Sequence, residues 1–209
     1  RGWFRDFPKS FIPKTMIPEA IMNPPVKWHG HIGAGFPRED QFDGPFEFPL
    51  EGQERIHMVW SDTPCWETCW NGGNEFQEAL RHDSIEFVII QHPWMENDCM
   101  FADIILPTNT TFEVEDIGTD SDNGQWNLVY DVQQAIQPRL DSKSDMQAVG
   151  EVAKKLEKFG GPYENLYHRY TGGKTELESI QAGFENCGAA KEMTFEEFKE
   201  KQYYPFPTM

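Results

Sequence analysis

The 209-residue sequence has no basic patch, no long apolar run and few cysteines. Its formal net charge of −17 argues against a nucleic-acid or anionic-membrane partner, because a surface of that sign repels phosphate groups. No apolar run approaches the roughly 18 residues that a membrane-spanning helix needs. The first residues also lack the apolar core of a signal peptide. We therefore expect a soluble, cytoplasmic protein without a membrane span.

The four cysteines are too few and too scattered for the disulfide framework of a secreted scaffold, so we expect reduced thiols. Two of them form a C-x-x-x-C pair, which is compatible with a metal site or a redox couple. Zinc needs four ligands, however, and neither a second pair nor clustered histidines accompany this one. Buried structural thiols are the simpler interpretation. The cysteines are Cys65, Cys69, Cys99 and Cys187.

Two further absences bear on function. The sequence has no G-x-G-x-x-G turn, which argues against an ordinary NAD site. It also has no initiator methionine, and we expect it to be an interior portion of a longer subunit.

Residues 1–54 contain eight of the 15 prolines, which predicts extended, irregular backbone. His29 and His31 in this lead-in are either acid–base groups or hydrogen-bonded structure. Aromatic side chains here and just beyond either pack in a core or interface, or form the wall of a pocket for an aromatic ring. These aromatic residues are Trp28, Phe42, Phe46, Phe48, Trp66 and Trp70.

From Arg55 onward the pattern changes to alternating strands and helices. Apolar strands are predicted at 55–61, 86–91 and 102–107, with a helix at 74–80 between the first two. This order predicts a βαβ unit with a parallel sheet, and we expect Ile104, Ile105 and Leu106 to be buried.

The rest of the chain is predicted to be mainly helical. Residues 126–136 read as extended, and helices are expected at 145–159, 175–184 and 194–200. Thr194 and Glu197 have the spacing of a capping box. The fold class is therefore α/β, a parallel sheet with flanking helices. The predicted divisions are a lead-in at 1–54, an α/β domain at 55–160 and a tail at 161–209.

Polar side chains follow each predicted strand. Ligands of open α/β sheets bind outside the carboxyl ends of the strands, so these residues are candidates for a nucleotide or pterin site. Their carbonyl, hydroxyl and carboxylate groups can hydrogen-bond the edges of a purine. The candidates are Ser61, Asp62, Thr63, Gln91, His92, Asp98, Asn109 and Asp116.

The ordered series EFVIIQ, ADIILP and Glu113-x-x-Asp116-Ile117 resembles the third domain of the dimethyl sulfoxide reductase superfamily of molybdenum enzymes, from about Ile56 to Gly160. The resemblance implies a bis(molybdopterin guanine dinucleotide) cofactor with molybdenum or tungsten. We assign neither a catalytic residue nor a metal ligand within this chain. The cofactor-binding residues that it implies are Trp60, Ser61, Asp62, Thr63, Pro64, Gln91, His92, Pro93 and Asp116.

The sequence departs from the superfamily pattern in both of the first two loops. Asp62-Thr63-Pro64 stands where relatives commonly have Gly-Asn-Pro, and residues 96–99 stand where relatives often have threonines. For Asp116 the alternative is an ordinary acid that caps local backbone N–H groups. We expect Glu113 to be structural.

Within the superfamily, the lead-in segments KTMIPEAIMNPPVKWHG and QFDGPFEFP most resemble the transhydroxylases that act on polyhydroxybenzenes. This implies hydroxyl transfer on a small aromatic substrate, an iron–sulfur partner subunit and the remainder of a large subunit, without which the chain would be inactive. The alternatives are an S-oxide, N-oxide or oxyanion reductase, a hydratase, or a noncatalytic interaction module.

Overall fold

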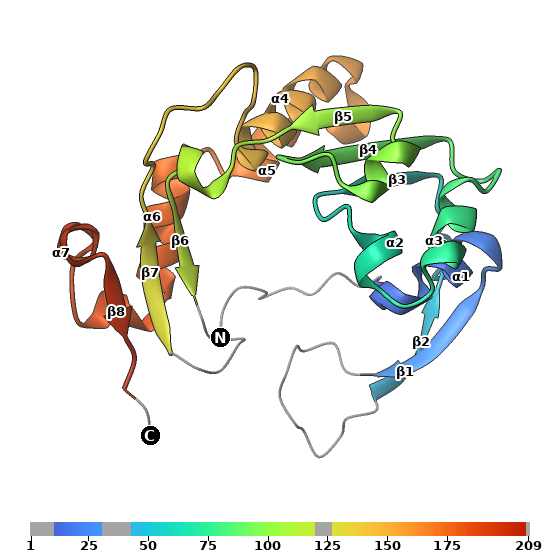
Figure 1. Cartoon of the computed structure of the whole chain (residues 1–209), viewed down its shortest axis with the longest axis horizontal. Helices are drawn as coiled ribbons and strands as arrows, with labels where there is room; N and C mark the ends of the chain where they lie inside the picture. The colour runs from blue at the N-terminus through green and yellow to red at the C-terminus, as the bar shows by residue number, and fades with distance from the viewer. Residues whose placement is uncertain (1–10, 31–42, 120–126, 208–209) are drawn as a thin grey trace. The chain divides into compact units, whose positions relative to one another are not determined.

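The computed structural model describes residues 11–30, 43–119 and 127–207. The chain forms two compact units, the first ending at Leu106 and the second beginning at Pro107 (Figure 1). Within the described ranges, no helix is long and apolar enough to cross a membrane. The predicted divisions at residues 54 and 160 stay a prediction.

The lead-in is more regular than its proline content predicts. A 3-10 turn and α1 precede β1, which pairs antiparallel with β2. Pro18 lies in the first turn of α1, where the missing N–H costs no helical bond. Pro45 lies in β2 where the register shifts, and bulges tolerate proline. The bounds are Lys14–Met16, Ile17–Met22 (α1), Val26–Gly30 (β1) and Asp43–Phe48 (β2).

The predicted parallel sheet is present in the first unit. Its strand order is β3-β4-β5, and β3 pairs parallel with β4, Val59 opposite Val88. Two helices connect β3 to β4, as Figure 1 shows. The bounds are Met58–Ser61 (β3), Trp66–Cys69 (α2), Gly73–Leu80 (α3), Phe87–His92 (β4), Asn97–Phe101 (η2) and Ile104–Pro107 (β5).

The core of this unit comes from the residues that the apolar pattern identified. The apolar side chains of α3, Phe76, Ala79 and Leu80, are buried, and β4 is buried from Val88 through Gln91. Full burial of one large apolar side chain contributes about 1.5–3 kcal/mol. This packing fixes the positions from which the loops after β3 and β4 emerge.

The expected burial of β5 is wrong. Ile104 and Ile105 are 43% and 36% exposed, and Leu106 is half-buried. Because β5 lies at the edge of the sheet, an apolar sequence alone does not reveal whether another element covers it.

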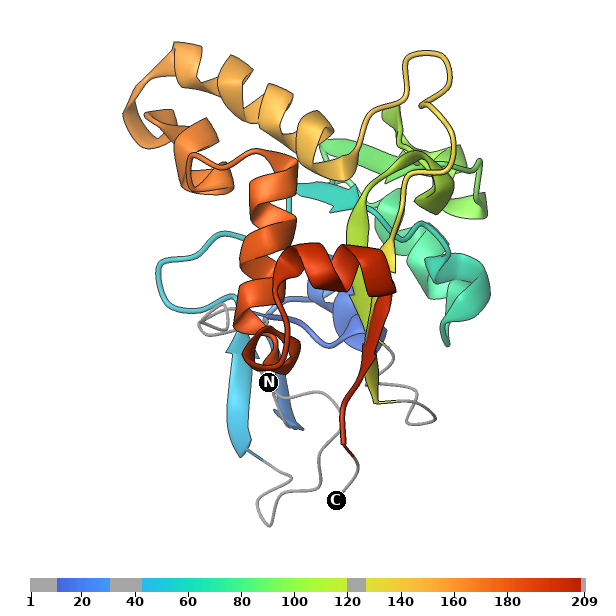
Figure 2. The ribbon, with the colours of Figure 1, turned by 90° about the vertical axis from the view of Figure 1, so that its left-hand side faces the viewer.

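The second unit contains an antiparallel sheet that the sequence did not predict. Its order is β6-β7-β8, and α6 packs on it, with Gly183 close to Ile117 (Figure 2). Asp116 begins β6 and so does not lie in a loop. The bounds are Thr111–Glu113 (η3), Asp116–Thr119 (β6), Leu128–Val132 (β7), Asp145–Leu156 (α4), Glu157–Phe159 (η4), Gly161–Tyr163 (η5), Leu166–Thr171 (α5), Glu176–Asn186 (α6), Gly188–Lys191 (η6), Phe195–Lys201 (α7) and Tyr203–Pro205 (β8).

The helices predicted here are confirmed. The predicted segment 145–159 becomes α4 and η4, and α6 and α7 match the other two predictions. The capping box of Thr194 and Glu197 is present at α7, and Thr175 with Glu178 forms a second one at α6. Each side-chain cap satisfies a backbone N–H that the helix leaves unpaired.

Candidate cofactor site

The ends of the two parallel strands are tied together by their side chains. Trp60 is the penultimate residue of β3, and its indole Nε1 donates a 3.1 Å hydrogen bond to Oε1 of Gln91 in β4. Gln91 is buried at 3% exposure, although it lies one residue from the end of its strand. Since parallel strands end at the same edge of the sheet, the first two predicted loops emerge side by side.

The loop after β3 is a compact polar turn. Ser61 is buried, and its Oγ accepts a 3.2 Å hydrogen bond from the backbone N–H of Thr63. The Thr63 hydroxyl donates a 3.0 Å bond to Oδ1 of Asp62, and both of these side chains are exposed. Pro64 is fully buried and anchors the turn. The loop therefore presents a carboxylate and a hydroxyl to the outside on a fixed base.

His92 ends β4 and is held by the following turn. Its Nδ1 lies 3.3 Å from the backbone N of Trp94 and 3.2 Å from its carbonyl oxygen. The ring and the following Pro93 are both half-buried. One ring nitrogen is thus occupied by local backbone, and none of the described residues forms a hydrogen bond with the other.

Asp98 was expected among the ligand-binding groups, and this expectation is wrong. Its side chain is 1% exposed, and its carboxylate accepts the backbone N–H groups of Trp66 at 2.8 Å and Glu67 at 3.2 Å. It therefore caps α2, which follows the first loop. Sequence reasoning missed this role because the partners lie 31 and 32 residues away.

The third predicted loop belongs to the second unit. Glu113 is structural as expected, since it accepts hydrogen bonds from Thr110 and from the backbone N–H of Arg139 at 3.0 Å. These bonds lower its pKa, those from Thr110 most. Asn109 has a buried Oδ1 without a hydrogen-bond partner.

Asp116 is exposed, and its Oδ1 accepts a 2.8 Å bond from the backbone N–H of Ile117. Desolvation by the surrounding protein raises its pKa, and the negative charges of Asp145 and Glu176 raise it further. The local capping expected as an alternative is therefore present. The convergence of Asp116 with the strand ends of the first unit stays a prediction.

The other candidates separate into small clusters. Trp28, Phe46 and Phe11 pack together, and Trp28 belongs to the buried core of the lead-in. Trp66 stacks on Trp70 with 5.4 Å between ring centroids. The exposed side chain of His29 lies on β1, whereas His31 and Phe42 fall outside the described residues.

An open apolar groove of about 360 Å³ runs along β3. Phe48 and Trp66, two of the predicted pocket aromatics, help to line it, as does Trp60. The side chains that line it are aliphatic and aromatic, and they offer mainly packing contacts.

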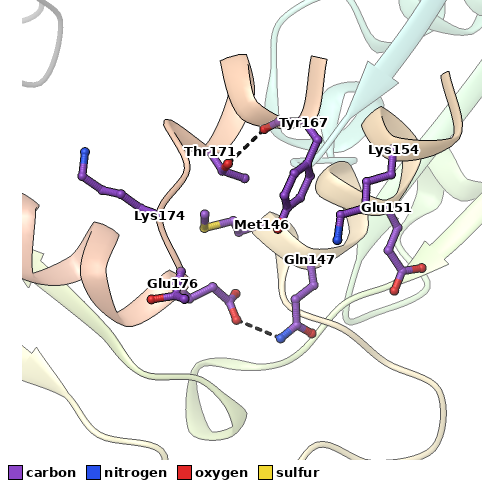
Figure 3. Close-up of a pocket in the computed structure, with 9 residues that line it drawn as sticks. Met146, Gln147, Glu151, Lys154, Tyr167, Thr171, Lys174 and Glu176 are labelled. Atoms are coloured by element: carbon purple, nitrogen blue, oxygen red, sulfur yellow. Dashed lines mark hydrogen bonds between the residues drawn. The ribbon is translucent and has the colours of Figure 1, made fainter. Parts of the chain in front are cut away.

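A second cavity, of about 280 Å³, lies between α4, α5 and the start of α6 (Figure 3). Its polar groups largely engage one another: Gln147 donates a 2.8 Å bond to Glu176, and the Nζ of Lys154 lies 4.0 Å from the ring centroid of Tyr167. None of the predicted cofactor-binding residues lines this cavity. These contacts are those of helices packed together, and we assign no ligand to the cavity.

Comparison with known proteins identifies the family of the chain. A family model described as molybdopterin oxidoreductase matches residues 51–155, half of the chain. The chain is 34% identical to the pyrogallol hydroxytransferase large subunit of Pelobacter acidigallici, over 94% of this chain and 22% of that protein. It is 28% identical to the dimethyl sulfoxide reductase DmsA of Escherichia coli K12, over 70% of this chain and 17% of that protein.

The fold has a counterpart among solved structures. Acetylene hydratase from Pelobacter acetylenicus superposes with a TM-score of 0.52 at 16% identity, covering 75% of this chain and 19% of that one. The chain thus spans about a fifth of the length of these relatives. On the strength of the family match, which includes the parallel sheet and both strand-end loops, the chain belongs to the molybdopterin oxidoreductase family.

Proposed function

We propose that this chain is part of the large subunit of a molybdenum enzyme and that its strand ends bind the guanine dinucleotide form of the molybdopterin cofactor. Membership of the family implies molybdopterin-bound molybdenum. The observation that carries the proposal is the Trp60–Gln91 bond, because it fixes two polar loops at one edge of the parallel sheet. Ligands of open α/β sheets bind at this edge.

The residues at this edge fit such a group. The carboxylate of Asp62 can accept the paired N–H donors of a guanine, and the Thr63 hydroxyl and the His92 ring can donate or accept. When bound, the cofactor supplies the oxygen-transfer and redox chemistry, while the protein residues bind and orient it. The proposed binding residues are Trp60, Ser61, Asp62, Thr63, Pro64, Gln91, His92, Pro93 and Asp116.

The reaction that we propose is hydroxyl transfer between polyhydroxybenzenes, from pyrogallol to phloroglucinol. The support is the identity of 34% with the pyrogallol hydroxytransferase large subunit, which extends over 94% of this chain. The proposal also includes the remainder of the large subunit, an iron–sulfur small subunit, and a cytoplasmic role in anaerobic metabolism. The acid–base groups and the molybdenum ligand are not assigned to this chain.

The test is metal and pterin analysis of the full-length native protein, followed by the Asp62→Asn variant. We expect molybdenum or tungsten, a pterin, and GMP after acid release from the native protein. Hydrogen bonds to a charged group contribute about 1.5–3 kcal/mol, which corresponds to about a ten- to a hundredfold loss of affinity in the variant. Absence of metal and pterin from the native protein would overturn the proposal.

Asp83→Asn is the matched control. It removes the same charge from an exposed carboxylate in the turn before β4, at the opposite edge of the parallel sheet. Cofactor content should be unchanged in this variant. Equal losses in both variants would mean that net charge, and not contact at the strand ends, governs binding.

The main alternative is a reductase of S-oxides or N-oxides. It is favoured by similarity to DmsA and to the trimethylamine-N-oxide reductase of Vibrio parahaemolyticus, which is 32% identical over 64% of this chain. Turnover assays with pyrogallol, an S-oxide and an N-oxide distinguish the two. Conversion of an oxide without conversion of pyrogallol would favour the reductase.

A further inference from the structure

Two cysteines bracket the short helix that follows the first strand-end loop. Cys65 is the residue before α2 and Cys69 is its last residue, and the backbone N–H of Cys69 donates a 2.8 Å bond to the carbonyl of Cys65. This single helical turn places both side chains on one side of α2. Both cysteines are free.

The pair is also accessible, contrary to the expectation of buried thiols. The Cys69 side chain is exposed and that of Cys65 is half-buried. Cys99 behaves as expected, because it is 5% exposed and packs in the core of the first unit. The C-x-x-x-C pair therefore differs from a structural buried thiol in its access to reagents.

The local structure holds the two thiols together. The carboxylate of Asp98 caps the start of α2, and Trp66 stacks on Trp70 across the same turn. Four residues along a helix rise by about 6 Å, which lies within the range of Cα separations that a disulfide spans. Cβ atoms four residues apart on a helix are about 5–6 Å apart, whereas a disulfide needs about 3.5–4.5 Å, so the single turn of α2 must tighten or unwind to join the two sulfurs.

We infer that Cys65 and Cys69 form a thiol–disulfide exchange site whose oxidant is a low-molecular-weight disulfide. The thiolate of Cys69, the more exposed residue, attacks one sulfur of the oxidant, forms a mixed disulfide and releases one thiol. The thiolate of Cys65 then attacks the Cys69 sulfur, and the second thiol leaves. Two cysteine thiols are oxidised to one disulfide, and one molecule of oxidant is reduced to two thiols.

The raised pKa of Cys65 also supports the order in which Cys69 attacks first and Cys65 second. The hydrogen bond with Cys69 raises the pKa of Cys65, and burial raises it further. Asp98 and Glu96 add to this through their negative charges. Cys65 is therefore suited to the second step, in which its partner sulfur is already adjacent.

The test uses the purified full-length protein, reduced and then treated with oxidised glutathione. Trypsin releases residues 56–81 as one peptide, because no lysine or arginine lies between Arg55 and Arg81. We expect this peptide to become lighter by two hydrogens and to carry no glutathione. An unreactive pair, or a peptide that retains glutathione on both cysteines, would overturn the inference.

Single variants identify the order. Cys65→Ser should accumulate a stable glutathione adduct on Cys69. In Cys69→Ser, the remaining thiol of Cys65 should react with oxidised glutathione more slowly. Cys187→Ser is the control, because Cys187 lies in the second unit and should leave the 56–81 peptide able to close. The mass readout does not depend on cofactor content, so this inference and the proposed function succeed or fail separately.

Discussion

Trp60 and Gln91 join the ends of β3 and β4 through one side-chain hydrogen bond of 3.1 Å. The bond lies beneath two loops that carry the proposed cofactor contacts. A planar indole donor and a buried amide acceptor leave little rotational freedom at this edge. The relationship therefore connects the packing of the parallel sheet to the positions of the polar groups above it.

Trp60→Phe should loosen this edge without removing the aromatic packing. Loss of one hydrogen bond with a buried acceptor costs about 1–3 kcal/mol. We expect faster backbone hydrogen exchange in β4 and a lower cofactor content in the full-length protein. Trp94→Phe is the control, because the Trp94 side chain is 62% exposed. Equal exchange in wild type and Trp60→Phe would show that the bond does not hold the strand ends.

Asp98→Ala should release the N-terminus of α2. Two backbone N–H groups would lose a charged acceptor, and each such loss costs about 1.5–3 kcal/mol. Asp98→Asn keeps one carbonyl acceptor and should have a smaller effect. Hydrogen exchange of the Trp66 and Glu67 amides measures both variants. Unchanged protection of these amides in Asp98→Ala would contradict the capping role.

Local signals in the sequence predicted local structure well. The Thr194–Glu197 capping box spans four adjacent positions, and the continuous apolar run of β4 reports burial directly. The strand ends of the parallel sheet followed from the order of β3, α3 and β4. These features depend on residues near one another in the chain, which is why pattern reasoning was sufficient.

Features that depend on distant partners were missed. β7 lies in the segment that was predicted to be extended, but Leu128 pairs with the distant Pro205 of β8, so no local pattern could identify the sheet. Asp98 finds its partners more than 30 residues away. Ile104 belongs to β5, which has the sequence of a buried strand but lies at the edge of the parallel sheet. The residues of a segment define which structures it can form, and its neighbours in the fold decide whether it is buried and which partners it pairs with.

Gly118→Ala should destabilise the second unit. Gly118 lies opposite Tyr130 in the β6–β7 pair, and a Cβ at this position would lie 2.3 Å from Cζ of the tyrosine ring. Because the Tyr130 ring is 41% exposed and can move aside, the cost in unfolding free energy should be about 1 kcal/mol, the lower end of the range for extra atoms in a packed core. The double variant with Tyr130→Ala makes room and should recover part of this cost. A glycine substitution that costs the same with and without the ring would contradict the steric explanation.

The carboxylates of Glu178 and Asp116 should change the stability of the second unit in opposite directions as the pH falls. The pKa of Glu178 is lowered by its hydrogen bonds with Thr175, so its charged form favours folding. This contribution is present above the unfolded pKa of about 4.3 and is lost as pH falls through the lower folded pKa. Glu178→Gln should destabilise α6 near neutral pH, and its difference from wild type should vanish in acid.

Asp116→Asn should behave in the opposite way. The pKa of Asp116 is raised, chiefly by desolvation, so its charged form opposes folding at neutral pH. The wild type regains this stability as pH falls through the raised pKa toward the unfolded value of about 3.9. The variant should therefore protect the β6 amides more than wild type near neutral pH, with the difference closing in acid.

The same variant tests whether Asp116 lowers the stability of the fold because it is needed for cofactor binding. If Asp116 binds the cofactor at the expense of stability, neutralising it should reduce the cofactor content of the protein while the folded state becomes more stable. We expect Asp116→Asn to raise amide protection in β6 and to lower the GMP released from the full-length protein. Higher amide protection in β6 with unchanged GMP release would mean that Asp116 is only a local cap, and would remove it from the proposed binding residues.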